Sequence, residues 1–467
     1  MTIEPFVCAD DIRSAFSAAM SEMYRKEVPA YGELLSLVAD VNSATLDNEP
    51  SLRNRLERSD SLDRISEERH GAIRLGTADE LSMMRRVFAV MGMYPVGYYD
   101  LSTAGVPVHS TAFRPIADAS LKRNPFRVFT SLLRLDLLAD EALREEARST
   151  LAVRDIFTPA ARRLVETAER DGGLGEADAA LFVAEVLETF RWHDRALVDV
   201  ELYHRLHDAH RLVADVVSFN GPHINHLTPR TLDIDAVQAG MPGRGIAPKA
   251  FVEGPPTRKC PILLRQTSFK ALEESISFRG SDGLWTSGSH TARFGEVEQR
   301  GIALTPKGRA LYDHVLEKAR KSVRPTPDGA NAGAYLEALA ESFSEFPDDW
   351  NAIRAQKLGY FSYSLAKPGK DMPREAVAAR DIEALVTTGV LEFDPIVYED
   401  FLPVSAAGIF RSNLGDDDAQ RFVESPNLKL FEEQLGTTVI DGFEHYARIE
   451  QASIEACLSA LALQVTA

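Results

Sequence analysis

The sequence predicts an α+β protein in which a βαβββ module occurs twice and forms a partly open barrel wrapped by helices. The first observation is a repeat, because His70 and His226 are each followed four residues later by an arginine, Arg74 and Arg230. The same offset of 156 residues (226 minus 70) aligns Asp79 with Asp235, Val96 with Val252, Thr111 with Thr267, Phe113 with Phe269, and Arg114 with Lys270. Matches in register over this length indicate an internal duplication.

The second observation is the order of strand and helix patterns in residues 65–135, which we interpret as the first module. Strand-like patterns occur at residues 65–75, 96–101, 106–113 and 126–133. After the first strand, Thr77 followed three residues later by Glu80 forms a capping box, which predicts a helix over residues 79–91. Residues 1–64 form a preceding helical segment, because apolar residues recur there at close to helical spacing.

The rest of the chain divides around a second module. Residues 136–213 are mostly helical and charged, which predicts a helical insertion. Residues 214–322 form the second module, with strands expected at 216–219, 262–271 and 294–304, a short helix at 233–238 and a helix from Thr305-Pro306 to Lys318. Residues 323–467 are a mixed α/β segment that closes the site and ends in an amphipathic helix.

Composition excludes several classes of function. The 467-residue chain has a net charge of −18, which argues against nucleic-acid binding because that binding depends on basic patches. The three cysteines, Cys8, Cys260 and Cys457, show neither zinc-ligand spacing nor a disulfide framework. No apolar run approaches the ~18 residues that span a bilayer, and the N-terminus lacks the apolar core of a signal peptide. We therefore expect a cytoplasmic protein with no membrane partner.

The duplication predicts a metal site. Two histidines at equivalent positions, His70 and His226, can converge when the two modules pack about a pseudo-twofold axis. A third ligand is expected from the strand that carries Glu296 and Glu298, which are two apart and therefore face the same way, so that spacing leaves both open. Two histidines and one carboxylate with open positions are the ligand set of non-haem Fe(II) oxygenases. Cysteine is absent from this set, which disfavours structural zinc.

Nearby residues leave alternatives. His223 competes with His226, but an odd separation of three puts the two on opposite faces of a strand, and the repeat selects His226. Arg74 is a candidate anion-binding residue near the metal, although a structural salt bridge to Glu67 or Glu68 is the alternative. We expect its repeat partner Arg230 to be structural, because only one pocket is expected.

The remaining histidines carry weaker signals. His204, His207 and His210 are spaced three apart, and at ~100° per residue the outer two do not share one face of a helix. We interpret them as part of a solvated helix and not as metal ligands. His193 and His290 lie in polar surroundings and are candidates for hydrogen-bond partners of the site.

Four segments carry a family resemblance. The segment FGEVEQRG is similar to the metal-glutamate strand of 4-hydroxyphenylpyruvate dioxygenase, and the duplicated module resembles the vicinal-oxygen-chelate superfamily. More closely, the chain resembles the 2-oxoadipate dioxygenase/decarboxylase (2-hydroxyglutarate synthase) family, through ERHGAIRLGT, NGPHINHLTPR, RFGEVEQRGIALT and FLPVSAAGIF, in that order. The resemblance extends over most of the chain.

The resemblance implies roles for individual residues. It implies Fe(II) bound by His70, His226 and Glu296, and so favours Glu296 over Glu298. It also implies that these three ligands lie against the substrate, that Arg74 anchors a substrate carboxylate, and that Val404-Ser405 makes backbone contacts to the substrate.

The implied reaction converts 2-oxoadipate and O₂ to 2-hydroxyglutarate and CO₂, in lysine catabolism. The partners would be this 2-oxo dicarboxylate and O₂. A ring-cleaving dioxygenase, a metal-dependent isomerase or lyase, and a non-catalytic metal-binding protein of the same fold are the alternatives. An isomerase would consume no O₂, a ring-cleaving enzyme would need an aromatic pocket, and a binding protein would show no turnover.

Overall fold

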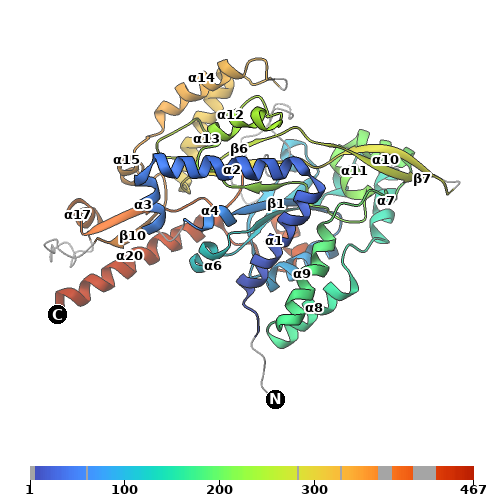
Figure 1. Cartoon of the computed structure of the whole chain (residues 1–467), viewed down its shortest axis with the longest axis horizontal. Helices are drawn as coiled ribbons and strands as arrows, with labels where there is room; N and C mark the ends of the chain where they lie inside the picture. The colour runs from blue at the N-terminus through green and yellow to red at the C-terminus, as the bar shows by residue number, and fades with distance from the viewer. Residues whose placement is uncertain are drawn as a thin grey trace. The chain divides into compact units, whose positions relative to one another are not determined.

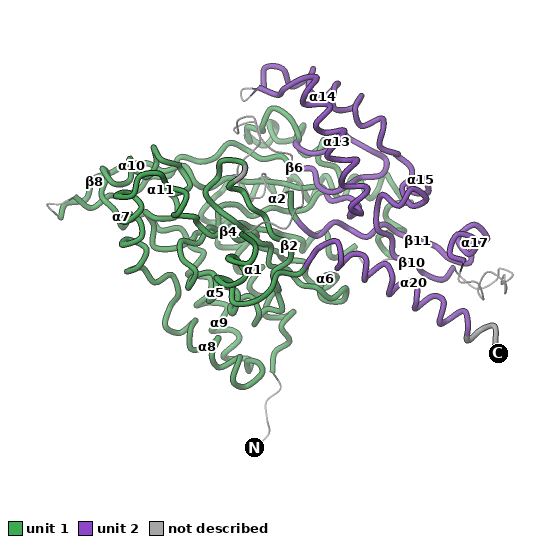
Figure 2. Tube along the Cα trace, turned by 180° about the vertical axis from the view of Figure 1, so that it is seen from behind, with its two compact units in different colours: residues 1–252, 266–299, 401–440 green, residues 253–265, 300–400, 441–467 purple. Residues whose placement is uncertain are grey.

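The computed structural model describes residues 6–58, 62–280, 283–326, 329–366, 381–402 and 427–466. The chain divides into two compact units, which Figure 2 distinguishes by colour. Unit 1 comprises residues 1–252, 266–299 and 401–440, and unit 2 comprises residues 253–265, 300–400 and 441–467. Val404 and Ser405 lie outside the described residues.

The central sheet of unit 1 has five strands in the order β2-β3-β4-β1-β5. Strands β2, β3 and β4 are antiparallel neighbours, whereas β1 runs parallel to β4 and antiparallel to β5. The strands are β1 (Arg69–Leu75), β2 (Tyr94–Asp100), β3 (Val108–Arg114), β4 (Arg127–Leu133) and β5 (Leu227–Pro229). Together with helix α5 (Ala78–Val90), strands β1 to β4 follow the order expected for residues 65–135, and the Thr77 side chain caps α5 by accepting from the Glu80 amide.

The two faces of this sheet bury two hydrophobic cores. Ile73 and Val128 belong to one core, while their neighbours Ala72 and Phe129 belong to the other, as expected for side chains that alternate along a strand. The first core is completed by α5 and by α1 (Ala9–Glu27), α2 (Pro29–Asn48), α8 (Pro159–Asp171) and α9 (Glu176–Phe190), the last four of which are labelled in Figure 1. The second is completed by α7 (Glu141–Ala152), α10 (Val200–Ala209) and α11 (Arg211–Ser218).

Two pairings in unit 1 agree with an internal duplication. Gly71 pairs with Leu227, and because 71 plus 156 is 227, this pair joins two positions that the repeat treats as equivalent. An antiparallel pair of equivalent residues is what a local twofold axis requires. Arg230 forms a parallel bridge to Glu298, just as β1 runs parallel to β4.

The helices and strands that follow agree in part with the second module. Helix α12 begins at Ile234, the position equivalent to the first residue of α5 (78 plus 156). Strand β6 (Leu264–Ser268) pairs with β9 (Glu296–Arg300). Between them, β7 (Glu273–Arg279) and β8 (Trp285–Thr291) form an antiparallel hairpin that was not predicted and that projects from unit 1 (Figure 1). The fold is therefore α+β, and the duplicated, partly open barrel stays a prediction.

One predicted strand and the predicted start of another were wrong. Residues 216–219 were expected to form a strand, but helix α11 runs to Ser218. All residues from Leu212 to Ser218 are buried, so the valine-rich segment shows no alternation that would separate a strand from a fully packed helix. The first strand was expected from residue 65, but a short helix, α4 (Arg64–Glu67), precedes β1.

The remaining helices and strands flank these cores. In unit 1 they are α3 (Pro50–Arg58), α6 (Asp118–Arg123), α12 (Ile234–Gly240) and α19 (Asn427–Leu435), with short 3₁₀ helices η1 (Ser102–Ala104), η2 (Leu135–Leu137) and η3 (Met241–Arg244). In unit 2 they are α13 (Pro306–Ser322), α14 (Ala332–Ser342), η4 (Phe343–Glu345), α15 (Trp350–Ala355), β10 (Phe361–Leu365), α17 (Ile382–Thr387), β11 (Leu391–Pro395) and α20 (Gly442–Thr466).

Unit 2 confirms two predictions about helix ends. Helix α13 begins at Pro306, and the Thr305 side chain caps it by accepting from the Gly308 amide. The expected C-terminal helix is α20, whose Leu458 and Leu461 pack in one core with Leu391 of β11. Strands β10 and β11 are antiparallel.

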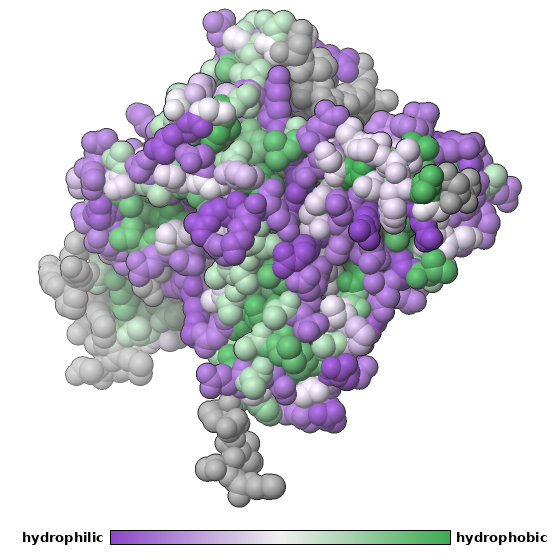
Figure 3. Space-filling view, turned by 45° about the vertical axis from the view of Figure 1, so that its right-hand side comes forward, coloured by the Kyte–Doolittle hydropathy of each residue, from purple (hydrophilic) through white to green (hydrophobic). Residues whose placement is uncertain are grey.

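The surface is mixed in character. Hydrophilic side chains are interspersed with hydrophobic areas on the face shown in Figure 3. None of the helices in the described part of the chain combines the length and apolar character needed to cross a bilayer.

Gly71 supplies a prediction about the β1–β5 pairing. A Cβ at this position would overlap the Ile224 side chain and lie 3.2 Å from the His226 carbonyl oxygen. We expect Gly71→Ala to lower the free energy of unfolding by about 1–3 kcal/mol, the usual cost of overpacking, as measured by urea denaturation. Gly243→Ala is the control, because a Cβ there meets nothing within 4 Å, and it should change stability by less than about 0.5 kcal/mol. Equal stability of the two variants would contradict the close approach.

Candidate metal centre

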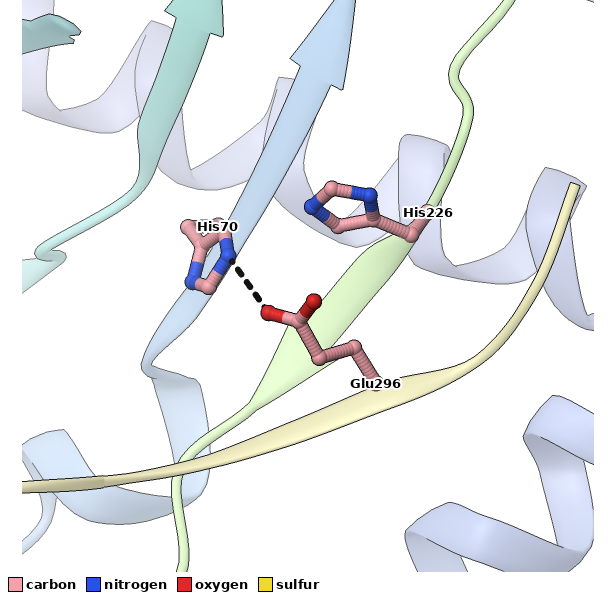
Figure 4. Close-up of side chains that lie close together, drawn as sticks. All are labelled: His70, His226 and Glu296. Atoms are coloured by element: carbon pink, nitrogen blue, oxygen red, sulfur yellow. Dashed lines mark ion pairs between the residues drawn. The ribbon is translucent and has the colours of Figure 1, made fainter. Parts of the chain in front are cut away.

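Three side chains from separate parts of unit 1 converge on one point. His70 lies on β1, His226 lies immediately before β5, and Glu296 is the first residue of β9. One ligand atom of each lies within 4.8 Å of the others, and Figure 4 shows the three side chains pointing toward one another. All three are fully buried, with exposures of 0%. The structure thus brings together the three residues that the sequence analysis selected as metal ligands.

A tyrosine of α1 ties together the segments that precede two of these residues. The Tyr24 hydroxyl lies 2.7 Å from the Phe294 carbonyl oxygen and 3.0 Å from the Asn225 carbonyl oxygen. The Phe294 amide also donates to the Asn225 carbonyl, at 3.1 Å. Because Asn225 directly precedes His226 and Phe294 lies two residues before Glu296, these bonds fix the two backbone segments relative to each other.

The Glu296 carboxylate is oriented from one side only. Its Oε1 accepts hydrogen bonds from Gln266 Nε2 at 2.6 Å and from Thr228 Oγ1 at 3.4 Å. Its Oε2, and both ring nitrogens of His226, have no hydrogen-bond partner among the described residues. Buried polar atoms are rarely left without partners, so these atoms are free to take the ligand role that their geometry suggests.

Burial also shapes the protonation of these groups. It raises the pKa of Glu296 above the usual carboxyl range, although the neighbouring His70 opposes this shift. Burial lowers the pKa of His226 well below the usual imidazole range, and the charges of His70 and Arg74 lower it further. A neutral His226 is the form that binds metal.

Glu296 and Glu298, which sequence spacing did not separate, contact opposite edges of the His70 ring. Glu296 Oε1 lies 3.3 Å from His70 Nε2, whereas Glu298 Oε2 lies 3.0 Å from His70 Nδ1. The Glu298 contact is at hydrogen-bond distance, although its direction is not ideal. Burial alone would lower the pKa of His70, but the two carboxylates raise it. Glu298 is thus placed to orient the His70 ring through Nδ1, the nitrogen directed away from Glu296, an arrangement common at metal-binding histidines.

A buried ion cluster lies behind Glu298. Glu68 is the hub, because its carboxylate oxygens lie 2.6 Å from Arg127 Nη2, 2.7 Å from Arg230 Nη1 and 3.2 Å from Arg64 Nε. Arg127 Nη1 is also 3.9 Å from Glu298 Oε1. Arg230 therefore lies in a buried ion pair, in agreement with the structural role expected for it.

Arg74 instead pairs with Asp215 of α11. Arg74 Nη1 lies 2.6 Å from Asp215 Oδ2, and the arginine is only 7% exposed. It lies four residues after His70 on β1, so the two side chains share a face of the strand. Beside it on β4 lies Ser131, whose hydroxyl is 2.7 Å from that of Ser110. The site face of β1 is thus polar at Arg74 as well as at His70.

Aromatic rings cover the His70 side of the centre. The Phe401 ring centroid lies 4.9 Å from that of His70 and 5.3 Å from that of Phe129, which in turn lies 5.2 Å from Tyr99. Rings packed in this way exclude water from the neighbouring polar groups. Phe401 is the first residue of the FLPVSAAGIF motif, of which Phe401 and Leu402 are described.

The other histidines take different positions. His223 Nε2 lies 3.3 Å from Asp215 Oδ1, in a non-strand segment, and His290 Nε2 lies 2.9 Å from the same oxygen. His290 therefore contacts the partner of Arg74. His204 and His207 are exposed on α10, and the His210 side chain caps α11. His193 is half-buried and does not belong to the ligand group found among the described residues.

Sequence analysis missed Asp215, Gln266 and Phe401. Asp215 had a detectable signal, because a lone carboxylate in the apolar run 212–217 is rarely buried without partners. Gln266 and Phe401 gave no comparable signal, since their roles depend on strands and loops that meet only in the folded chain.

Known proteins resemble this chain over nearly its whole length. A relative from Pseudomonas putida named 2-oxoadipate dioxygenase/decarboxylase is 55% identical over 463 residues, which is 99% of each chain. One of the same name from Escherichia coli is 55% identical over 451 residues, covering 97% of this chain and 98% of the relative. The crystal structure of the hydroxyglutarate synthase in complex with 2-oxoadipate from Pseudomonas putida has a TM-score of 0.88, at 55% identity, and covers 98% of this chain and 99% of its own.

The family itself is defined by a sequence model described as 2-oxoadipate dioxygenase/decarboxylase. This model matches residues 16–413 and so includes His70, Arg74, His226 and Glu296. The match confirms the resemblance inferred from the four motifs. The chain belongs to the 2-oxoadipate dioxygenase/decarboxylase family.

Proposed function

We propose that this protein is a cytoplasmic Fe(II)-dependent enzyme that converts 2-oxoadipate and O₂ to 2-hydroxyglutarate and CO₂, in lysine catabolism. The observation that carries the proposal is the buried group of two histidines and one glutamate, in a chain whose relatives are named for this reaction. Its ligand atoms fit Fe(II), because imidazole and carboxylate are the donors of non-haem iron oxygenases. When bound, Fe(II) supplies a Lewis acid for the carboxylate and keto oxygens of a 2-oxo acid and for O₂.

The protein's own residues hold this ligand set in place. Glu298 faces His70 Nδ1, which leaves Nε2 directed toward Glu296. Gln266 and Thr228 bind one oxygen of Glu296 and so set the plane of its carboxylate. Removal of a group that orients a metal ligand in this way usually lowers metal affinity or activity by about 10- to 100-fold.

Arg74 is proposed to bind the distal carboxylate of the substrate. A guanidinium can form two parallel hydrogen bonds to a carboxylate, which fixes both position and orientation. Arg74 shares a face of β1 with His70, and only the small Ala72 lies between them on that face. A chain held at both ends, by the metal and by Arg74, keeps the carbon to be hydroxylated in one place. The backbone of Val404 and Ser405 is proposed to contact the same substrate.

The duplicated module supports the same assignment. We propose that it is of the vicinal-oxygen-chelate type, on the grounds that β1 and β5 pair about equivalent residues and each half supplies one histidine. The ring-cleaving alternative is less well supported, because the face of β1 beside the ligand group carries a buried arginine, whose charge and shape suit a carboxylate.

Turnover is the first test. The protein is loaded with Fe(II) without oxygen, 2-oxoadipate is added, and ¹⁸O₂ is then admitted. We expect equal amounts of O₂ consumed, CO₂ released and 2-hydroxyglutarate formed. The product should carry two labelled oxygens, one in its new carboxylate and one in its hydroxyl group. No oxygen uptake with 2-oxoadipate or with neighbouring 2-oxo acids would leave only an isomerase, a lyase or a binding protein.

The ligand assignment gives a second test, by anaerobic titration with Fe(II). Glu296→Ala removes a proposed ligand and should abolish iron binding. Glu298→Gln removes only the charge behind His70 and should weaken binding by about 10- to 100-fold. If the stronger loss were found for Glu298→Gln, the two roles would have to be exchanged.

The anchor gives a third test. Arg74→Ala should still bind Fe(II), but its KM for 2-oxoadipate should rise by about 10-fold or more, because hydrogen bonds to charged groups contribute about 1.5–3 kcal/mol. The paired Arg134→Ala, which removes a guanidinium bound to Asp136 outside the site, is the control. An unchanged KM in Arg74→Ala would show that Arg74 does not hold the substrate.

A further inference from the structure

A line of buried polar groups extends from Arg74 away from the metal centre. Asp215 of α11 joins Arg74 to His290, because its Oδ2 lies 2.6 Å from Arg74 Nη1 and its Oδ1 lies 2.9 Å from His290 Nε2. His223 Nε2 also lies 3.3 Å from Oδ1. His290 of β8 is held in turn by Tyr203 of α10, whose hydroxyl lies 2.7 Å from the other ring nitrogen. Arg74, Asp215, His290 and Tyr203 are all buried, with exposures between 5% and 7%.

Asp215 is ionised in this setting. Burial alone would raise the pKa of its carboxyl, but the neighbouring His223 and Arg74 and the hydrogen bond from His290 hold the pKa well below the usual range. The charges of Arg74 and Asp215 also act on Arg211 at the start of α11.

The network restricts the Asp215 carboxylate at both oxygens. The ring of His290 cannot turn freely, because Tyr203 binds one nitrogen and Asp215 the other, and the Phe219 ring lies 4.9 Å from it. A carboxylate held in this way defines where the Arg74 guanidinium lies. Long arginine side chains otherwise lose considerable rotamer freedom on binding, which weakens binding.

We propose that Asp215, supported by His290 and Tyr203, is a positioning residue that holds Arg74 ready for the distal carboxylate and so sets the preference for dicarboxylic over monocarboxylic 2-oxo acids. The inference rests on the proposed role of Arg74 as the substrate anchor. If the ion pair had only a structural role, its loss would weaken the binding of all ligands alike. A positioning role acts only on ligands that carry the distal carboxylate.

The test compares two ligands of equal chain length on the Fe(II)-loaded full-length protein without oxygen. Calorimetry gives the Kd of 2-oxoadipate and of 2-oxohexanoate, which lacks the distal carboxylate. We expect Asp215→Asn to raise the Kd of 2-oxoadipate by about tenfold, as for the loss of a hydrogen bond to a charged group. The affinity for 2-oxohexanoate should stay within about twofold. Equal weakening of both ligands, or of neither, would overturn the positioning role.

Two further variants keep the test decisive. Tyr203→Phe removes only the hydroxyl that holds His290, so it should reduce the preference in the same direction by a smaller factor even if Asp215→Asn fails to fold. An unchanged preference in Tyr203→Phe would then contradict the supported network. Asp136→Asn is the matched control, because Asp136 pairs with Arg134 at 2.7 and 2.8 Å outside the site, and it should leave both affinities unchanged.

Arg74→Ala separates this inference from the proposed function. If Arg74→Ala loses the preference for 2-oxoadipate while Asp215→Asn keeps it, the anchor stands and only the positioning role fails. If Arg74→Ala keeps the preference, the anchor itself is wrong.

Discussion

The antiparallel pairing of β1 with β5 is the constraint on which the site depends. It joins Gly71 to Leu227, two positions that are equivalent in the repeat, and so brings His70 and His226 to the same side of the sheet edge. No larger residue fits at Gly71 without displacing Ile224. The third ligand follows from the same geometry, because the bridge between Arg230 and Glu298 places β9 beside the segment that leaves β5. The β1–β5 pairing and this bridge together determine where the three ligands meet.

Placing so many charged groups in a protein interior requires that each charge be compensated. A buried charge without a partner is strongly destabilising, whereas a hydrogen-bonded pair is tolerated. Glu68 meets this requirement by binding three arginines, and Asp215 does so through Arg74 and His290. The consequence is rigidity, because a compensated ion has few alternative positions.

Much of this arrangement could be predicted from the sequence, and the failures have physical causes. The Thr77 cap and the strand-like segments between residues 65 and 133 are local signals, so the order of the strands and the helix in this part of the chain was predicted well. The end of helix α11, from Val216 to Ser218, was taken for a strand because its residues are all buried and show no helical periodicity. The β7–β8 hairpin was missed because its side chains are mostly exposed, small or polar, and carry little β pattern.

The site shows the same division between local and long-range information. His70 and His226 were identified through the repeat. Glu296 was distinguished from Glu298 only by the family resemblance, because spacing along a strand does not show which ring nitrogen of His70 each carboxylate contacts. Asp215 was not found, since its importance arises from a contact with Arg74 across 141 positions of sequence. Ligand residues recur as motifs, whereas the residues that orient them are chosen by packing. For that reason, the residues that determine the substrate selectivity of such a site are best sought among those that orient the binding side chains. Asp215, which holds Arg74, is the first candidate.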